Sequence, residues 1–297
     1  MTKKFSRKIV AIRGDTQSGH AGGLLNPEAM FPVVGIDADG KAVVEDYEEA
    51  KLNPVQRQLW KWSESDRENV QMLAGKDEVV FIEMGDMTQG VRFTDDLAET
   101  SLSRQMLSSF YNSLPWLGMD HVRTMRAVKG TGVHVWGEGS TETILTMLLQ
   151  KEYPKKDVKI ADHYLLNVDG YLLDVSHHGP GPGLRNWTRG NAFELYVKSI
   201  LLDDLNAKRI PPSLVLRGHK HEFTYAHAIH QVQGAVWQLP AMIVPPYCFI
   251  GSHAQKATNS PSSMGVGTIA LELVNGKLLD WHAFTHYVDL RTEEILQ

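Results

Sequence analysis

Two histidines near the end of the chain stand in a setting typical of metal ligands. His219 and His221 belong to the sequence Gly218-His219-Lys220-His221, which follows the apolar run 213–216. Such a run predicts a buried strand, so a loop at the edge of a sheet would present both imidazoles. Neutral imidazoles bind zinc, iron, manganese or nickel. Because His-x-His pairs are common, this pair becomes informative only if other strand ends also carry ligands.

Four earlier strand ends carry side chains of the same kind. In each, a short apolar or β-branched run is followed by a turn with polar residues. These residues are Asp15, Gln17 and His20 after the run 9–12, Asp86 after 79–82, Thr131 and His134 after 125–128, and His177 and His178 after 171–175. Ligands of open α/β sheets bind beyond the carboxyl ends of the strands. We therefore expect the five loops to meet at one site.

Helical patterns separate these strands and predict a layered α/β domain. We expect helices at 54–74, 94–114, 140–150 and 191–206, and further strands at 236–239, 266–274 and 278–290. Asn53 and Pro54 suit a helix start, and Asn275-Gly276 suits a tight turn between the last two strands. Met106 and Phe110 belong to the apolar residues at helical spacing that mark the expected core side of the second helix.

A hairpin-plus-helix insertion is expected at about residues 33–74, between the first two strand ends. The sequence Asp37-Ala38-Asp39-Gly40 is a turn signal between short β-like runs, and the helix start at Asn53 follows. The insertion fits a rim or lid of the site and a surface decoration equally well. Since no stretch reads as a linker, we predict one domain over residues 1–297.

Composition places the chain among ordinary globular proteins. Hydrophobic residues make up 42% and charged residues 22% of the 297 residues, which allows a sizeable core. The net charge of −5 argues against a generic nucleic-acid coat protein, although divalent ions can supply a positive field locally.

A single cysteine, Cys248, excludes an internal disulfide framework and a thiolate zinc cluster. No apolar stretch suits a signal peptide or a membrane span, so we expect a cytoplasmic protein without a membrane partner.

The ordered set of strand-end motifs resembles the calcineurin-like metallophosphoesterase superfamily. The family signature is Asp-x-His, Gly-Asp, Gly-Asn-His, a His after a strand, and Gly-His-x-His. Asp15, Gly85-Asp86, His177 and the segment 218–221 match it, and the resemblance spans roughly residues 8 to 290. The segment 130–134, Gly-Thr-Gly-Val-His in place of Gly-Asn-His, is similar to uncharacterised phage and prophage members of the family.

This resemblance implies a fold, a cofactor and a set of roles. The fold would be a four-layer α-β-β-α sandwich of two mixed sheets. The cofactor would be two divalent metal ions, drawn from manganese, nickel, zinc, iron and magnesium. By position, the ligands would be Asp86 between the two ions, Asp15, Gln17 and His221 at the first ion, and His177 and His219 at the second. His134 would be the unligated imidazole that donates a proton or a hydrogen bond to the leaving group.

Two positions depart from the family signature. Gln17 stands where the family has a histidine, and its carbonyl oxygen is a harder ligand that favours manganese or magnesium. Thr131 offers a hydroxyl where the family has an amide oxygen. His20 and His178 are expected to contact ligands or substrate rather than an ion.

The function that follows is metal-dependent phosphoester hydrolysis. The leading hypothesis is a phosphodiesterase or nuclease that uses a bridging hydroxide. The substrate would be a phosphate ester, with nucleic acids or nucleotides favoured by the phage-like motifs; the oligomeric state stays open. Alternatives are a phosphomonoesterase acting on small metabolites or phosphoproteins, and a non-catalytic scaffold that retains the fold. Arg185 and Arg189 fit a phosphate-binding loop or a plain helix-entry loop. Motifs of zincin peptidases, P-loop proteins and serine hydrolases are absent from the sequence.

Overall fold

The computed structural model describes residues 6–134, 140–181, 190–232, 234–251, 263–291 and 294. Its larger sheet has six strands in the order β13-β12-β1-β4-β5-β6. These strands are β1 (Arg7–Arg13), β4 (Glu78–Glu83), β5 (Val122–Val128), β6 (Asp157–Ala161), β12 (Ser263–Val274) and β13 (Lys277–Asp289). Strands β1, β4, β5 and β6 are parallel, whereas β12 and β13 run antiparallel to their neighbours. The sheet is therefore mixed, with its parallel strands ending at one edge.

The second sheet has five strands in the order β10-β11-β9-β8-β7. Its members are β7 (His163–Val168), β8 (Tyr171–Ser176), β9 (Leu214–Arg217), β10 (Thr224–Val232) and β11 (Ala235–Ile243). Strands β8, β9 and β11 are parallel, and β7 and β10 are antiparallel edge strands. Each strand run predicted outside the 33–74 insertion thus lies in one of two mixed sheets.

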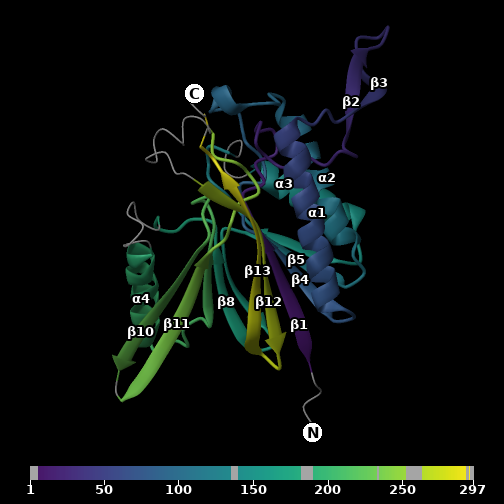
Figure 1. Cartoon of the computed structure of the whole chain (residues 1–297). Coiled ribbons are helices and arrows are strands. Elements are labelled where there is room, and N and C mark those ends of the chain that lie inside the picture. Colours follow the sequence, from purple (N-terminus) through teal and green to yellow (C-terminus); the bar gives the residue numbers. More distant parts are fainter. Residues whose placement is uncertain are drawn as a thin grey trace.

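The central strands are apolar throughout because both of their faces are buried. In β1, Ile9 and Ala11 face the helices α1 (Pro54–Ala74), α2 (Leu102–Gly118) and α3 (Ser140–Glu152), while Val10 and Ile12 face the second sheet. On the far side of that sheet, α4 (Asn191–Asn206) packs through Phe193. Helices therefore cover the outer faces of two sheets that pack against each other, as an α/β sandwich requires (Figure 1).

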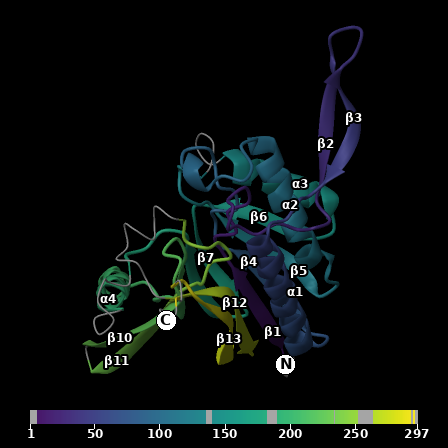
Figure 2. The ribbon, with the colours of Figure 1, turned by 45° about the horizontal axis from the view of Figure 1, so that its top comes forward.

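The insertion between β1 and β4 contains the predicted hairpin and helix. The hairpin, β2 (Met30–Ile36) and β3 (Ala42–Glu49), projects away from the sheets in both views (Figures 1 and 2). Helix α1 begins with a capping box, in which the Asn53 and Gln56 side chains each accept from the other's backbone N–H, and it ends before Gly75. The start and the end predicted for this helix are confirmed.

The prediction for the second helix was wrong at its start. Thr94–Asp96 forms a separate 3₁₀ turn, and α2 begins only at Leu102. The intervening chain is diverted because Ala98 N and Glu99 N both donate to Gly19 O, at 2.9 and 3.1 Å. The buried face of α2 is also largely polar, since it includes Gln105, Ser109 and Asn112, whereas Met106 and Phe110 are only partly buried.

A buried polar network fastens α1 to the sheet behind the first loop. Asp66 on α1 accepts hydrogen bonds from Tyr247 Oη and, at 2.7 Å, from His286 Nε2, and Trp62 stacks on the His286 ring. Tyr247 N in turn donates to Gly14 O at 3.0 Å. Burial raises the pKa of Asp66 to about 6, against the hydrogen bonds from Tyr247 and His286 that lower it. This network ties α1 to the loop that carries Asp15.

Asp66 should make the stability of the fold depend on pH. Folded Asp66 has a pKa of about 6, above the 3.8 of an ordinary Asp, so its contribution is present below about pH 4 and is lost as pH rises through 6. Asp66→Asn removes this titration. Between pH 4 and 7, the unfolding free energy of the variant relative to wild type is expected to rise by about 2–3 kcal/mol, measured by urea denaturation. A constant difference across this range would contradict the assignment.

No helix in the described part of the chain has the length and apolar character needed to span a bilayer.

Candidate metal centre

The loops after the predicted strand ends meet at one place. Asp15 N donates to Gly85 O at 3.1 Å and Gln17 N to Asp86 O at 2.9 Å, which joins the loops after β1 and β4. Gly218 N donates to His177 O at 2.9 Å, which joins the loops after β9 and β8. Both pairs of loops lie at carboxyl ends of parallel strands, where the sequence placed the site.

Strained backbone is concentrated in these loops. Eight described residues other than glycine have a positive φ, and five of them are predicted ligands: Asp15, Gln17, Asp86, His219 and His221. A left-handed backbone costs such residues about 1–3 kcal/mol each and persists where surrounding structure enforces it. A Cβ on Gly130 would lie 2.1 Å from Asp86 Oδ1, so only glycine permits this approach. The surrounding structure therefore holds these side chains in position at a cost in folding stability.

Asp86 lies at the middle of the cluster. The carboxylate accepts hydrogen bonds from Thr131 N at 2.5 Å, from Thr131 Oγ1 at 3.1 Å and from His177 Nε2 at 2.9 Å. Burial alone would raise the pKa of Asp86, but the charge and hydrogen bond of His177 hold it well below its usual range. Burial likewise opposes the charged His177 ring, yet Asp86 raises the pKa of His177 to about 9. Asp86 is thus an ionised carboxylate bonded to Thr131 and His177, with one of its oxygens within 4.8 Å of a carboxylate oxygen of Asp15.

One donor group combines Asp86 with Thr131, His177 and His219. Thr131 Oγ1 lies 3.3 Å from His177 Nε2 and 3.1 Å from His219 Nδ1. Donor atoms that share one zinc-sized ion lie about 3–3.5 Å apart, so these spacings suit a common ion. His177 Nδ1 lies 2.6 Å from Met84 O and donates to it, which directs Nε2 toward Asp86. The hydroxyl of Thr131 therefore lies among the donors, at the position where the family signature has an amide oxygen.

The other donor group combines Asp15, Gln17 and His221. His221 Nε2 lies 3.6 Å from Asp15 Oδ1 and 3.3 Å from Gln17 Nε2. Burial lowers the pKa of His221 to about 4, so the ring is neutral and able to donate a lone pair. Asp15 Oδ1 and His221 Nδ1 are buried and have no hydrogen-bond partner among the described residues. An unpaired buried oxygen such as Asp15 Oδ1 is expected of a metal ligand, whereas His221 would bind through Nε2, so its unpaired Nδ1 is not a donor to the same ion.

The charges of the cluster also fit cations. The ion-pair partners of the buried Asp15 and Asp86 in the described chain are histidines, without lysine or arginine. Burial, opposed by the charge of His177 and assisted by the charge of Asp86, raises the pKa of Asp15 to about 7. A divalent cation would supply the missing positive charge and keep Asp15 ionised. The buried Asp and His groups could therefore hold a metal ion.

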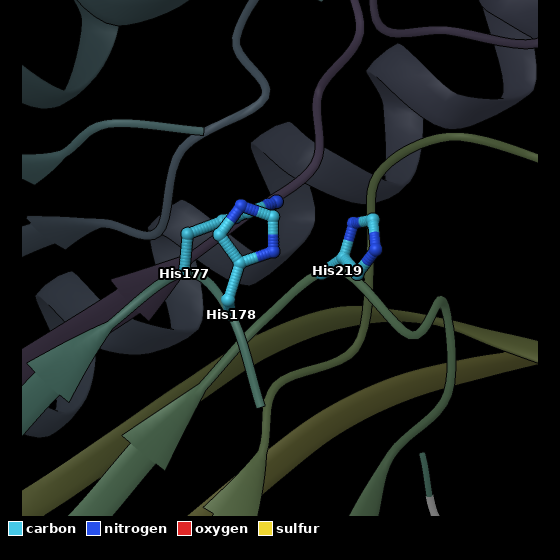
Figure 3. Close-up of side chains that lie close together, drawn as sticks. All are labelled: His177, His178 and His219. Carbon is cyan, nitrogen blue, oxygen red and sulfur yellow. The ribbon is translucent and has the colours of Figure 1, made fainter. Parts of the chain in front are cut away.

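His178 lies closer to the donors than the sequence suggested. Its ring centroid is 5.0 Å from that of His177 and 4.9 Å from that of His219, and one nitrogen from each ring could reach a common ion (Figure 3). Unlike His177, the His178 side chain is exposed. Burial and the neighbouring His177 and His219 lower its pKa. It remains able to serve as an additional ligand or as a contact to substrate.

His134 and His20 lie outside both donor groups. His134 Nδ1 donates to Gln89 O at 2.7 Å, and its Nε2 is 3.9 Å from Asp86 Oδ2. His20 Nδ1 accepts from Gly22 N at 2.8 Å, so its ring is held by its own loop. Both histidines line a cavity of about 360 Å³ beside the cluster, and no described residue of the β2–β3 hairpin does so. Arg185 and Arg189 lie outside the described residues.

Glu142 is a supporting residue that sequence reasoning missed. This buried side chain in the first turn of α3 accepts hydrogen bonds from Met87 N at 3.1 Å and Gly130 N at 2.7 Å. It therefore joins the loop of Asp86 to the loop of Thr131. Burial and the charge of Asp86 raise the pKa of Glu142 to about 7. An acid in a first helical turn is common, so the sequence held no signal that set it apart.

Glu142→Gln should loosen both loops. The amide keeps one acceptor oxygen but turns its NH₂ group toward a backbone donor, so we expect a loss of about 1–3 kcal/mol of unfolding free energy. Metal affinity should fall with it, because the loops of Asp86 and Thr131 lose their common anchor. Thermal melting and metal titration measure both effects. Glu152→Gln, at the exposed end of the same helix, is the matched control; equal effects of the two substitutions would refute the anchoring role.

No protein-family model and no curated protein matches this chain.

Proposed function

We propose that this chain is a metal-dependent phosphoesterase with the calcineurin-like metallophosphoesterase fold, acting on phosphodiesters of the nucleotide or nucleic-acid class. The observation that supports the proposal most is two neighbouring donor groups, one around Asp86 and His177 and one around Asp15 and His221, with carboxylate oxygens of Asp15 and Asp86 within 4.8 Å of each other. In the group of Asp15, Gln17 and His221 (the Asp15 side), a buried, unpaired oxygen lies near His221. In the group of Asp86, Thr131, His177 and His219 (the His177 side), four donor atoms lie at the spacing of metal ligands. A structural core has no need of two neighbouring buried carboxylates whose ion-pair partners in the described chain are histidines alone.

Bound divalent ions would act as Lewis acids that activate water and neutralise charge on the phosphate. The remaining tasks fall to the chain. Asp86 stays ionised because of His177, and the Met84 carbonyl fixes the orientation of the His177 ring. His134 is oriented in the same manner by the Gln89 carbonyl, which leaves its Nε2 beside the cluster. From there, His134 can donate a proton to a leaving-group oxygen.

The direct test is hydrolysis of bis-p-nitrophenyl phosphate by metal-stripped protein, with manganese, nickel, zinc, cobalt and magnesium returned one at a time. We expect turnover that depends on the added ion, and slower turnover of p-nitrophenyl phosphate under the same conditions. Turnover of the monoester alone would favour a phosphomonoesterase instead. An absence of turnover with every ion, together with an absence of metal binding, would leave the scaffold interpretation in its place.

Gln17→His should strengthen metal binding at the Asp15 side. Imidazole is a better ligand for zinc, nickel or cobalt than an amide oxygen, and position 17 already lies 3.3 Å from the His221 ring. We expect affinity for one of two ions to rise about tenfold or more, measured by competition with a chromophoric chelator. Gln231→His on exposed β10 controls for an added surface histidine. If the variant binds both metal ions with the affinity of wild type, Gln17 does not face an ion.

A further inference from the structure

The cavity beside the donor groups has walls that the proposed hydrolysis does not explain. Its volume of about 360 Å³ lies within the range of pockets that enclose small organic ligands. Phe93, Phe249 and Ile250 line it together with Gln89 and Lys220, and the ligand candidates His219 and His221 form part of the same lining. A group covalently attached to a phosphate at the metal centre would therefore reach this cavity.

The aromatic walls come from separate loops. Phe93 precedes the 3₁₀ turn and is 45% exposed, with its ring centroid 6.1 Å from that of His134. Phe249 follows β11 and is fastened to the first loop, because its N–H donates to Gly22 O at 2.8 Å. Aromatic side chains beside a polar cluster can stack on the flat face of a ring system in a ligand.

Gln89 adds a polar group of a particular kind. Its side chain is 3% exposed and lines the cavity, yet its Oε1 has no hydrogen-bond partner within the described ranges. A buried acceptor without a partner is costly, so a ligand that donates a hydrogen bond there would be favoured. A primary amide presents an acceptor and donors in one plane, which matches the edge of a nucleobase.

We propose that this cavity is a subsite for an unpaired nucleobase whose attached phosphate lies at the donor groups. The inference rests on the proposed phosphoesterase function and names its substrate class: a nucleotide, or a single-stranded end of a nucleic acid. The base stacks between the walls at Phe93 and Phe249, its edge meets the Gln89 amide, and Lys220 supplies a positive charge near the phosphates. A base inside a duplex remains stacked on its neighbours and does not enter.

Calorimetric titration of manganese-loaded protein with AMP, CMP and ribose 5-phosphate tests the base subsite. Both nucleotides are expected to bind at least about tenfold more tightly than ribose 5-phosphate. Phe93→Ala and Phe249→Ala should each weaken nucleotide binding about fivefold to one-hundredfold and leave ribose 5-phosphate binding unchanged. Tyr47→Ala, an exposed aromatic on the projecting hairpin, should change neither. Equal affinities for AMP and ribose 5-phosphate would overturn the proposal.

Saturation-transfer NMR with the unaltered protein gives a second readout that requires no variant to fold. Adenosine without phosphate should receive saturation mainly at its base protons, and a stronger transfer to the ribose would contradict the subsite. This result is independent of catalysis. Base-selective binding without metal-dependent hydrolysis would refute the phosphoesterase function alone, whereas hydrolysis without base selectivity would refute the subsite alone.

A 5′-phosphorylated single-stranded tetranucleotide and its duplex distinguish the two sources of such a base. Tighter binding of the single strand than of AMP would identify a nucleic-acid end as the ligand, and the reverse order would identify the free nucleotide. The duplex should bind most weakly of the three. A duplex that binds as tightly as the single strand would overturn the requirement for an unpaired base.

Discussion

Asp86→Asn is expected to abolish metal-dependent hydrolysis, with a loss of about a thousandfold or more in kcat/KM, which corresponds to at least about 4 kcal/mol of transition-state stabilisation. Asp86 is the carboxylate in contact with the His177 donor group, and its loop is bonded to the loop of Asp15 and Gln17. An amide of the same size removes the negative charge that both ions would share. Metal affinity should therefore fall at both sites, measured by titration, and the turnover of bis-p-nitrophenyl phosphate should fall with it.

Asp169→Asn is the matched control for this substitution. Asp169 also has a positive φ, of 54°, but it lies in the β7–β8 turn, at the opposite end of β8 from His177, and pairs with Lys8. Its replacement should leave hydrolysis and metal affinity unchanged. Circular dichroism must show that both variants remain folded. A folded Asp86→Asn variant that keeps both ions and full turnover would show that Asp86 is not a metal ligand.

His134→Gln should lower kcat about 10²- to 10⁴-fold while metal affinity stays the same. The ring is held by Gln89 O and stands 3.9 Å from Asp86 Oδ2 without joining either donor group. Since a proton donor matters most when the leaving group is poor, the loss should be larger for an alkyl ester than for a p-nitrophenyl ester. Turnover of methyl p-nitrophenyl phosphate and of a dinucleotide measures this difference.

The control for His134 is His163→Gln, which replaces an exposed histidine paired with Asp174 on the edge strand β7. It should leave kcat unchanged for every ester. If His134→Gln lowers metal affinity instead, His134 is a ligand and the proton must come from another group. A loss of equal size for good and poor leaving groups would likewise exclude proton donation.

The positions of the donors followed from the sequence because the strands that carry them are buried on both faces. Runs such as 9–12 and 79–82 are continuously apolar, and the first polar residue after each run marks the strand end. The parallel arrangement of β1, β4 and β5 then brings Asp15, Asp86 and Thr131 to one edge. Local pattern and topology thus sufficed to predict which side chains meet.

Other features depend on contacts that no local pattern reveals. The start of α2 is decided by the carbonyl of Gly19, more than 70 residues earlier in the chain. The polar face of α2 is buried because Gln105 Nε2 donates to Gly90 O at 2.9 Å and Ser109 Oγ to Met87 O at 2.6 Å, so it supports loops instead of a core. Glu142 acts in the same way. Since their partners are backbone atoms of distant loops, these residues look ordinary in the sequence.

The two departures from the family signature have different structural outcomes. Thr131 places its hydroxyl 3.1 Å from Asp86 Oδ2 and 3.1 Å from His219 Nδ1, so the two additional residues before His134, Gly132 and Val133, do not displace it from the cluster. Gln17 lies beside His221, with its amide near the ring. We therefore expect the Asp15 group to bind its ion more weakly, which is the reason to expect Gln17→His to act there.

The most direct measurement is anomalous X-ray diffraction from crystals soaked in manganese. We expect two peaks on either side of Asp86, one in contact with Asp15 and His221 and the other in contact with His177 and His219. Occupancy should be lower at the Asp15 side, where Gln17 replaces an imidazole. A single peak at the His177 side would reduce the centre to one ion, and the absence of any peak near Asp86 at saturating manganese would contradict the metal centre itself.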